Sequence, residues 1–165
     1  MKILSIILML LMLTGCSAQP TWETVHDDWV DVAAVPAKKI TIKLPKEAAA
    51  PTLQSEESGA LYACDGYVLM LQTFQGGDMD ATMRRLTGFS RDQLTCLQTQ
   101  SGTTKRYTCV WSSVGEGGDH VGRAVILDDG SHHYAVSVMA DFESAGELAE
   151  TWQEILNSAE LTDTD

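Results

Sequence analysis

The histidines near the end of the chain, and the acids beside them, are the first residues to test for chemistry. His132 and His133 closely follow Asp128 and Asp129, and imidazoles with carboxylates are common zinc ligands. Adjacent residues of a strand point to opposite faces, so the two imidazoles are not expected to meet at one ion. His120 would have to join them from another loop. We therefore expect no metal site and interpret the pair as exposed histidines at the end of a hairpin.

Two loops resemble ligand sites only superficially. Asp128-Asp129-Gly130 lacks the further oxygen ligands of a calcium loop and is explained by a turn. Residues 115–118 are rich in glycine, but the Lys and the Ser or Thr of a phosphate-binding loop are missing, and Glu116 and Asp119 would repel phosphate. The sequence therefore predicts no cofactor.

Cys64 is the one candidate nucleophile, paired with a histidine from elsewhere in the chain. No base stands beside it in the sequence, and it adjoins the turn residues Asp65 and Gly66. The four tryptophans could line a ligand groove, although large rings in a chain of this size are more often part of the core; they are Trp22, Trp29, Trp111 and Trp152. We expect no catalytic residues, and the alternative is a site assembled from distant residues.

Cys96 and Cys109 are the candidate disulfide. A two-residue turn at Gly102-Thr103 would join two strands and place the two cysteines directly opposite each other. Cys64 would then remain a free thiol, which suits an odd number of cysteines in an exported domain. The alternative is three buried, reduced thiols that act as small apolar side chains.

The N-terminal segment contains the motif with the most specific meaning. Lys2 precedes an apolar run over residues 3–13, which ends in Leu13-Thr14-Gly15-Cys16. This pattern resembles a bacterial lipobox. The resemblance implies diacylglycerol on the thiol of Cys16 and cleavage between Gly15 and Cys16. The lipid would hold the chain on the outer, extracytoplasmic face of the cell membrane.

The alternatives are an ordinary signal peptide with a chance cysteine, or a transmembrane anchor. A spanning helix needs about 20 apolar residues, and the chain turns polar between Thr14 and Pro20. We therefore expect residues 1–15 to be a signal peptide that is removed. Residues 16–38 would be the lipidated N-terminus and tether, residues 39–161 a single globular domain, and residues 162–165 an acidic tail.

Charge narrows the range of partners. The formal net charge of −12 becomes −13 if Lys2 leaves with the signal, because no acid precedes Cys16. Such a molecule would be repelled by nucleic acid and by an anionic lipid surface, so we expect neither as a direct partner. The expected contacts are the membrane, through the lipid, and an unknown envelope protein or ligand. Alternatively, the acidity serves only to keep a tethered domain soluble.

The first half of the domain reads as strands, a connector and one helix. Residues 21–32 suit either a marginal helix or an edge strand, residues 39–44 alternate in strand period, and residues 46–58 read as a loop. Asp65-Gly66 is a strong hairpin signal between residues 61–64 and 67–74. Asp78 can cap a helix that ends at Gly88, with Met79, Met83 and Leu86 on one face.

The second half reads as two hairpins and a closing helix. Ser90 to Gln93 has capping-box spacing before the strand of Cys96, and residues 121–127 and 132–140 flank the turn at Asp128-Asp129-Gly130. Ser144 with Glu147 predicts a second capping box. The helix behind it would place an apolar stripe on the sheet, formed by Ala145, Leu148, Trp152, Ile155, Leu156 and Ala159. Residues 161–165 read as a frayed tail.

This order of elements resembles the PsbP/Mog1-like fold. The resemblance rests on residues 40–45, 67–74, 133–138 and 152–158, and covers roughly residues 39–161. It implies an α+β domain, an α/β/α sandwich with an antiparallel sheet of about five to seven strands. A C-terminal amphipathic helix and a shorter internal helix would pack on the sheet. The family consists mostly of accessory and binding proteins and supplies no catalytic residues. We therefore expect an envelope binding or accessory protein, and the alternative is a small extracytoplasmic enzyme.

Overall fold

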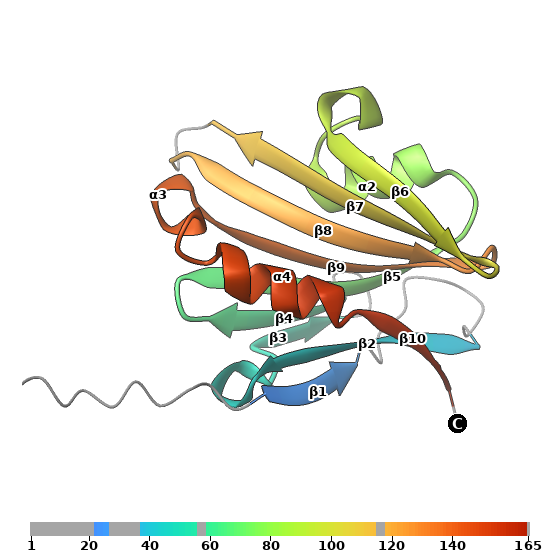
Figure 1. Cartoon of the computed structure of the whole chain (residues 1–165), viewed down its shortest axis with the longest axis horizontal. Coiled ribbons are helices and arrows are strands. Elements are labelled where there is room, and N and C mark those ends of the chain that lie inside the picture. Colours follow the sequence, from blue (N-terminus) through green and yellow to red (C-terminus); the bar gives the residue numbers. More distant parts are fainter. Residues whose placement is uncertain (1–21, 27–36, 56–58, 115–117, 165) are drawn as a thin grey trace, which may run out of the picture.

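The computed structural model describes residues 22–26, 37–55, 59–114 and 118–164. In these ranges the chain forms two antiparallel sheets and a few helices, so the expected mixed α+β class is confirmed (Figure 1). The lipobox, Trp29 and residues 115–117 lie outside the described residues. No helix among the described residues is long and apolar enough to cross a membrane.

The larger sheet has seven strands, and every neighbouring pair is antiparallel. Its strand order is β3-β4-β5-β9-β8-β7-β6, which leaves β3 and β6 as the two edges. The strands are, in chain order, β3 (Leu53–Ser55), β4 (Gly59–Cys64), β5 (Tyr67–Gln75), β6 (Thr95–Ser101), β7 (Thr104–Ser113), β8 (His120–Asp128) and β9 (His132–Asp141).

A second sheet of three strands corrects several expectations. Its order is β1-β2-β10, with bounds Trp22–His26, Lys38–Pro45 and Glu160–Asp163. The strand predicted at residues 39–44 therefore belongs to this sheet and not to the main one. The segment beginning at Trp22 is an edge strand, and residues 160–163 form β10 where a frayed tail was expected. Both flanking strands pair with β2 through contacts distant in sequence, which local patterns do not reveal.

The region expected to be a loop before β4 also carries structure. Lys46–Ala48 forms the short 3-10 helix η1, and β3 pairs with β4 from Leu53 onward. A strand of only three residues at the edge of a sheet is too short for strand periodicity to indicate it, and the exposed Leu53 and Gln54 show no buried apolar position.

The predicted hairpin turns are confirmed. Cys64 pairs with Tyr67 across Asp65-Gly66, and Ser101 pairs with Thr104 across Gly102-Thr103. Gly66 and Gly102 have positive φ values of 78° and 59°, which glycine adopts without strain. The β8–β9 turn likewise closes with Asp128 opposite His133.

The internal helix α2 (Met79–Thr87) begins and ends as predicted. The Asp78 carboxylate accepts hydrogen bonds from the amides of Asp80 and Ala81, and Gly88 closes the helix with φ at 80°. Beyond it, the Ser90 and Gln93 capping box forms at the 3-10 helix η2 (Arg91–Gln93). These terminal signals are local, which is why the sequence alone reveals them.

The C-terminal helix differs from its prediction. It is broken into α3 (Phe142–Ala145) and α4 (Ala149–Asn157), and the expected Ser144 capping box is absent, because Ser144 already lies inside α3. Gly146 stands at the break, where its low helix propensity favours a turn. α4 and α2 both contain nine residues, so the internal helix is not the shorter one. The predicted apolar stripe nevertheless packs into the core.

Two apolar clusters lie on opposite faces of the large sheet. On the first face, α4 and the small sheet together cover β4, β5, β8 and β9, with Trp152 and Ile40 fully buried. On the second face, α2 covers only part of the sheet, with Met83 packed near Phe74 and Ile126. One layer of the expected α/β/α sandwich is therefore a mixture of helix and sheet (Figure 1).

Candidate functional site

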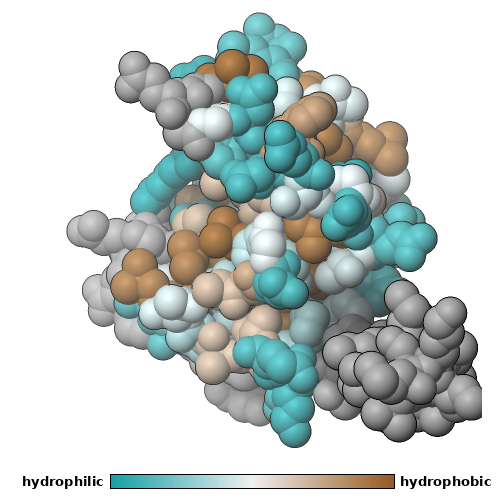
Figure 2. Space-filling model, turned by 90° about the vertical axis from the view of Figure 1, so that its left-hand side faces the viewer, coloured by the Kyte–Doolittle hydropathy of each residue, from teal (hydrophilic) through white to brown (hydrophobic). Residues whose placement is uncertain are grey.

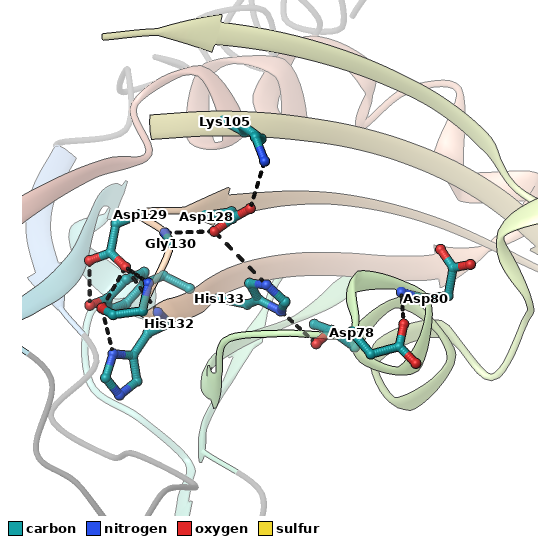
Figure 3. A network of polar contacts seen from close by, with 11 residues as sticks. Asp78, Asp80, Lys105, Asp128, Asp129, Gly130, His132 and His133 are labelled. Carbon is teal, nitrogen blue, oxygen red and sulfur yellow. Dashed lines mark hydrogen bonds and ion pairs between the residues drawn. The ribbon is translucent and has the colours of Figure 1, made fainter. Parts of the chain in front are cut away.

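The polar network around His133 is the densest group of chemistry-bearing side chains near the β8–β9 turn (Figure 3). Nδ1 of His133 lies 2.7 Å from the hydroxyl oxygen of Thr82, and Nε2 lies 4.0 Å from a carboxylate oxygen of Asp128. The other carboxylate oxygen of Asp128 lies 3.9 Å from Nζ of Lys105. Hydroxyl, imidazole and carboxylate thus follow one another in the order that nucleophilic hydrolases use.

Burial argues that this network is structural. His133 is 2% exposed and Thr82 is 6% exposed, so the hydroxyl lies between α2 and the sheet where a substrate would not reach it. Burial also lowers the pKa of His133, although the nearby carboxylates of Asp128 and Asp129 oppose this effect. A neutral imidazole hydrogen-bonded to Thr82 therefore ties α2 to β9.

The two histidines expected to be exposed are both buried. His132 is 7% exposed, and its Nδ1 lies 3.0 Å from the hydroxyl of Ser131. The prediction overlooked tertiary packing, because α2 meets His133 through Thr82, and Ser131 of the turn contacts His132. The described residues contain no group of three side chains able to hold a metal ion.

The acids of this turn fold the chain back on itself. One oxygen of Asp129 accepts hydrogen bonds from the amides of Ser131 and His132, and its other oxygen accepts from the Tyr134 hydroxyl. Partial burial would raise the pKa of Asp129, but these hydrogen bonds outweigh it and hold the pKa below its ordinary value. The carboxylate of Asp128 accepts from the Gly130 amide in the same way. These hydrogen bonds within the turn therefore explain the positions of both carboxylates without a bound ligand.

A cavity of about 480 Å³ beside the β4–β5 turn is the best candidate for a ligand site. Cys64 lies in its wall together with Tyr67. The residues that close it come from the end of β2, from η1 and from the N-cap and first turn of α4; they include Pro45, Ala48, Leu148 and Thr151. A second cavity, of about 460 Å³, adjoins the same turn and shares Ala63, Cys64 and Tyr67 in its lining.

Tyr67 is the feature of this site that sequence analysis missed. Its ring packs edge-on against Trp152, and its hydroxyl oxygen is buried beside the Cys64 thiol. Burial raises the pKa of the Tyr67 phenol, and the neighbouring thiol raises it further. The signal was present in the hairpin register, because the turn at Asp65-Gly66 places the residue after it opposite Cys64.

The surroundings of Cys64 do not activate it as a nucleophile. Burial raises the pKa of its thiol, whereas a nucleophilic thiol needs a lowered pKa. His120 also lines the second cavity, but its side chain lies on the opposite face of the sheet from that of Cys64. Val121, the next residue of β8, packs against the same apolar cluster as Cys64, and successive residues of a strand point to opposite faces. His120 instead contacts Asp141 at 3.1 Å. The pairing of Cys64 with a histidine that we considered is therefore not formed.

The cavity end of the molecule also exposes apolar side chains. Phe142 is 63% exposed and Met139 is 38% exposed, and Met139 lines the second cavity. Figure 2 views this end and shows apolar residues gathered across its middle between hydrophilic ones. Of the tryptophans, Trp111 and Trp152 are buried and Trp22 is partly exposed, so a tryptophan-lined groove is not formed by the described rings. The arrangement suits binding of an apolar group more than bond-making chemistry.

Cys96 lies directly opposite Cys109, and the two sulfur atoms form a disulfide. Cys64 is the free cysteine of the described residues. The bridge joins β6 to β7 on the face covered by α2, where Cys109 is fully buried. It fixes the edge of the sheet and brings no reactive group to the cavities.

Comparison with known proteins supports the fold alone. No family model and no curated protein matches the chain. Among solved structures, the chain is similar to the Ran-binding protein Mog1p of Saccharomyces cerevisiae, with a TM-score of 0.51 and 10% sequence identity. The match covers 87% of this chain and 97% of Mog1p. The comparison supports the expected resemblance to the Mog1-like fold, and at this identity nothing about function transfers.

Proposed function

We propose that this protein is an extracytoplasmic lipoprotein that is anchored by Cys16 and acts by binding, as an accessory protein of the cell envelope. The main observation in support is that only a short stretch of chain separates the lipobox from the folded domain. Leu13-Thr14-Gly15-Cys16 ends six residues before Trp22, the first residue of β1. Six extended residues span at most about 20 Å. The folded domain would therefore sit close to the membrane surface.

The strand register supports a particular orientation for such an anchored domain. Trp22 pairs with Pro45, and Pro45 lines the larger cavity beside Cys64. The described fold therefore begins at the cavity end of the molecule, and a tether on Cys16 would leave from this end. An anchored domain would hold its two cavities and its exposed Phe142 toward the membrane, where they could bind an apolar segment of an envelope protein.

The chemistry of the described side chains also favours binding over catalysis. His133 is enclosed, His120 and Cys64 point to opposite faces, and the pKa of the Cys64 thiol is raised. A nucleophile, a base and an orienting group do not converge in either cavity, as an active site would require.

Crosslinking of the full-length protein in cells tests the proposal. Ala63 is exposed and lines both cavities, so Ala63→Arg would place a long charged side chain at their shared wall. We expect this change to abolish the crosslink to the partner. Ala81→Arg, at an exposed position of α2, is the matched control and should retain the crosslink.

Two further variants separate binding from catalysis. Cys64→Ala and His120→Ala should lower any turnover far less than the removal of a catalytic group would, because neither side chain is placed to react. Loss of a catalytic group lowers a turnover rate by several orders of magnitude. A loss of that size from either change would show that the protein is an enzyme and would contradict the binding proposal.

A further inference from the structure

No strand among the described residues pairs with the outer edge of the large sheet at β6. This strand has seven residues, of which only Cys96 is partly buried, and its sequence contains no charged residue and no proline. Natural proteins normally protect a long sheet edge with charges, proline or a covering loop. The opposite edge, β3, has only three residues. β6 is therefore the edge suited to pairing with another strand.

The backbone groups that face outward from β6 follow from its pairing with β7. The Cα atoms of Cys96 and Cys109 lie 4.2 Å apart, which is typical of a pair that exchanges no backbone hydrogen bonds. Such pairs alternate along the ladder, so Gln98 and Gln100 share this geometry. The N–H and C=O groups of these three residues point away from β7. They form three donors and three acceptors along the free edge.

The hairpin that carries this edge differs in charge from the rest of the chain. No Asp or Glu occurs between Asp92 and Glu116, whereas the chain as a whole holds 23 acids and a net charge of −12. The same stretch contains Lys105 and Arg106. Two copies of so acidic a protein repel each other over most orientations, but at β6 they can approach without placing acids opposite each other.

We propose that two copies of this protein pair through β6 as antiparallel neighbours centred on Gln98, forming a continuous fourteen-stranded sheet from the two seven-stranded sheets. In this register Gln98 faces the partner's Gln98, and Cys96 faces the partner's Gln100. All the outward backbone groups of both copies then meet a partner. Moving the centre by one residue in either direction leaves some of them unpaired, so the register is specified by the backbone itself.

The side chains of the edge agree with this pairing. Leu97 is 66% exposed, and Val110 beside it on β7 is 39% exposed on the same face. In the proposed register Leu97 lies opposite the partner's Thr99 and diagonal to the partner's Leu97, within reach of a long side chain. Pairing would therefore cover apolar surface that a single copy leaves in water.

The symmetry of the pair fixes which faces and ends of the two copies lie together, and the inference does not depend on a membrane anchor. The two-fold axis would run perpendicular to the sheet, so both copies keep the same face on the same side. The small sheet packs on one face only, and β1 belongs to it. Both N-terminal strands would therefore lie on the same side of the dimer, with the cavity ends of the two copies pointing in opposite directions along the strands.

A charge exchange at position 98 tests the pairing directly. Two full-length copies carrying different C-terminal tags are expressed together, extracted in detergent and purified through one tag. We expect wild-type copies to purify together. Gln98→Lys alone or Gln98→Glu alone should reduce co-purification on the order of tenfold, because like charges then face each other across the axis. Combining a Gln98→Lys copy with a Gln98→Glu copy should restore it.

The exposed Gln153 of α4 provides the matched control: Gln153→Lys and Gln153→Glu should change nothing in any combination. Absence of wild-type co-purification would overturn the proposal. Co-purification that is unchanged by the charges at position 98 would also overturn the proposal. A loss in both single variants without recovery in the mixture would overturn it too, because it would assign the edge to a strand of another protein.

Discussion

The side chains of Thr82 and His133 meet at 2.7 Å although they are 51 positions apart in the chain. Thr82 comes from α2 and His133 from β9, so this contact joins the only α-helix on its face of the sheet, among the described residues, to a central strand. Both side chains are buried, and each would otherwise leave a polar group without a partner.

Thr82→Val should therefore destabilise the protein by about 1–3 kcal/mol, the usual cost of leaving a buried polar group unsatisfied. Chemical unfolding of the purified variant measures the change. Thr24→Val on β1, where the side chain is exposed, should shift the unfolding free energy by less than about 0.5 kcal/mol. Equal effects at the two positions would contradict the role given to the buried contact.

Acidification should weaken the fold through His133. Burial lowers its pKa below the ordinary value of 6.5, so the unfolded chain takes up the proton at a higher pH than the folded protein. The stability contribution is therefore complete above about pH 6.5 and is lost as the pH falls through the folded-state pKa. Unfolding free energies measured between pH 7 and 5 should decline less steeply in His133→Gln. An unchanged slope would show that this imidazole does not control the acid response.

Gly122 should tolerate no side chain. It lies opposite Trp111 in the β7–β8 pair, and a Cβ atom at this position would overlap the indole ring. Gly122→Ala should cost about 1–3 kcal/mol through the displaced ring, with a change in tryptophan fluorescence. Gly146→Ala is the matched control, because nothing lies within 4 Å of its added Cβ and its backbone is helical. It should be neutral or slightly stabilising, and a loss there equal to that of Gly122→Ala would contradict the overlap.

The protein isolated from cells without reduction should contain the Cys96–Cys109 bridge and a Cys64 outside it. Exchanging both bridge cysteines for alanine should lower the unfolding free energy by about 3 kcal/mol, on the chain-entropy estimate for a loop of this size. Cys64→Ala should have a smaller effect because this side chain is only half-buried. Peptide mapping without reduction provides the direct check, and detection of Cys64 in the bridge would contradict it.

Features that depend on neighbouring residues were predictable from the sequence. The turn at Asp65-Gly66, the Asp78 cap and the register that sets Cys96 opposite Cys109 each follow from a few consecutive side chains. The apolar stripe from Ala145 to Ala159 was predictable for the same reason. The break at Gly146 was not, since helix propensity at one residue is a weak signal.

Features that depend on distant partners were not predictable. β10 is polar and short, and it becomes a strand only because β2 offers it an edge. The contact between Thr82 and His133 and the position of Tyr67 against Trp152 likewise require the finished fold. The cavity beside Cys64 is built from η1, the β4–β5 turn and α4, and no single stretch of sequence indicates it.

Incorporation of labelled fatty acid is the measurement that tests the central claim most directly. Cells that express the full-length protein should incorporate the label into it, and Cys16→Ser should abolish both the labelling and the cleavage after Gly15. Cys64→Ser, at the free cysteine of the fold, is the control and should retain both. Labelling that persists in Cys16→Ser would contradict the account of this chain as a lipoprotein anchored through Cys16.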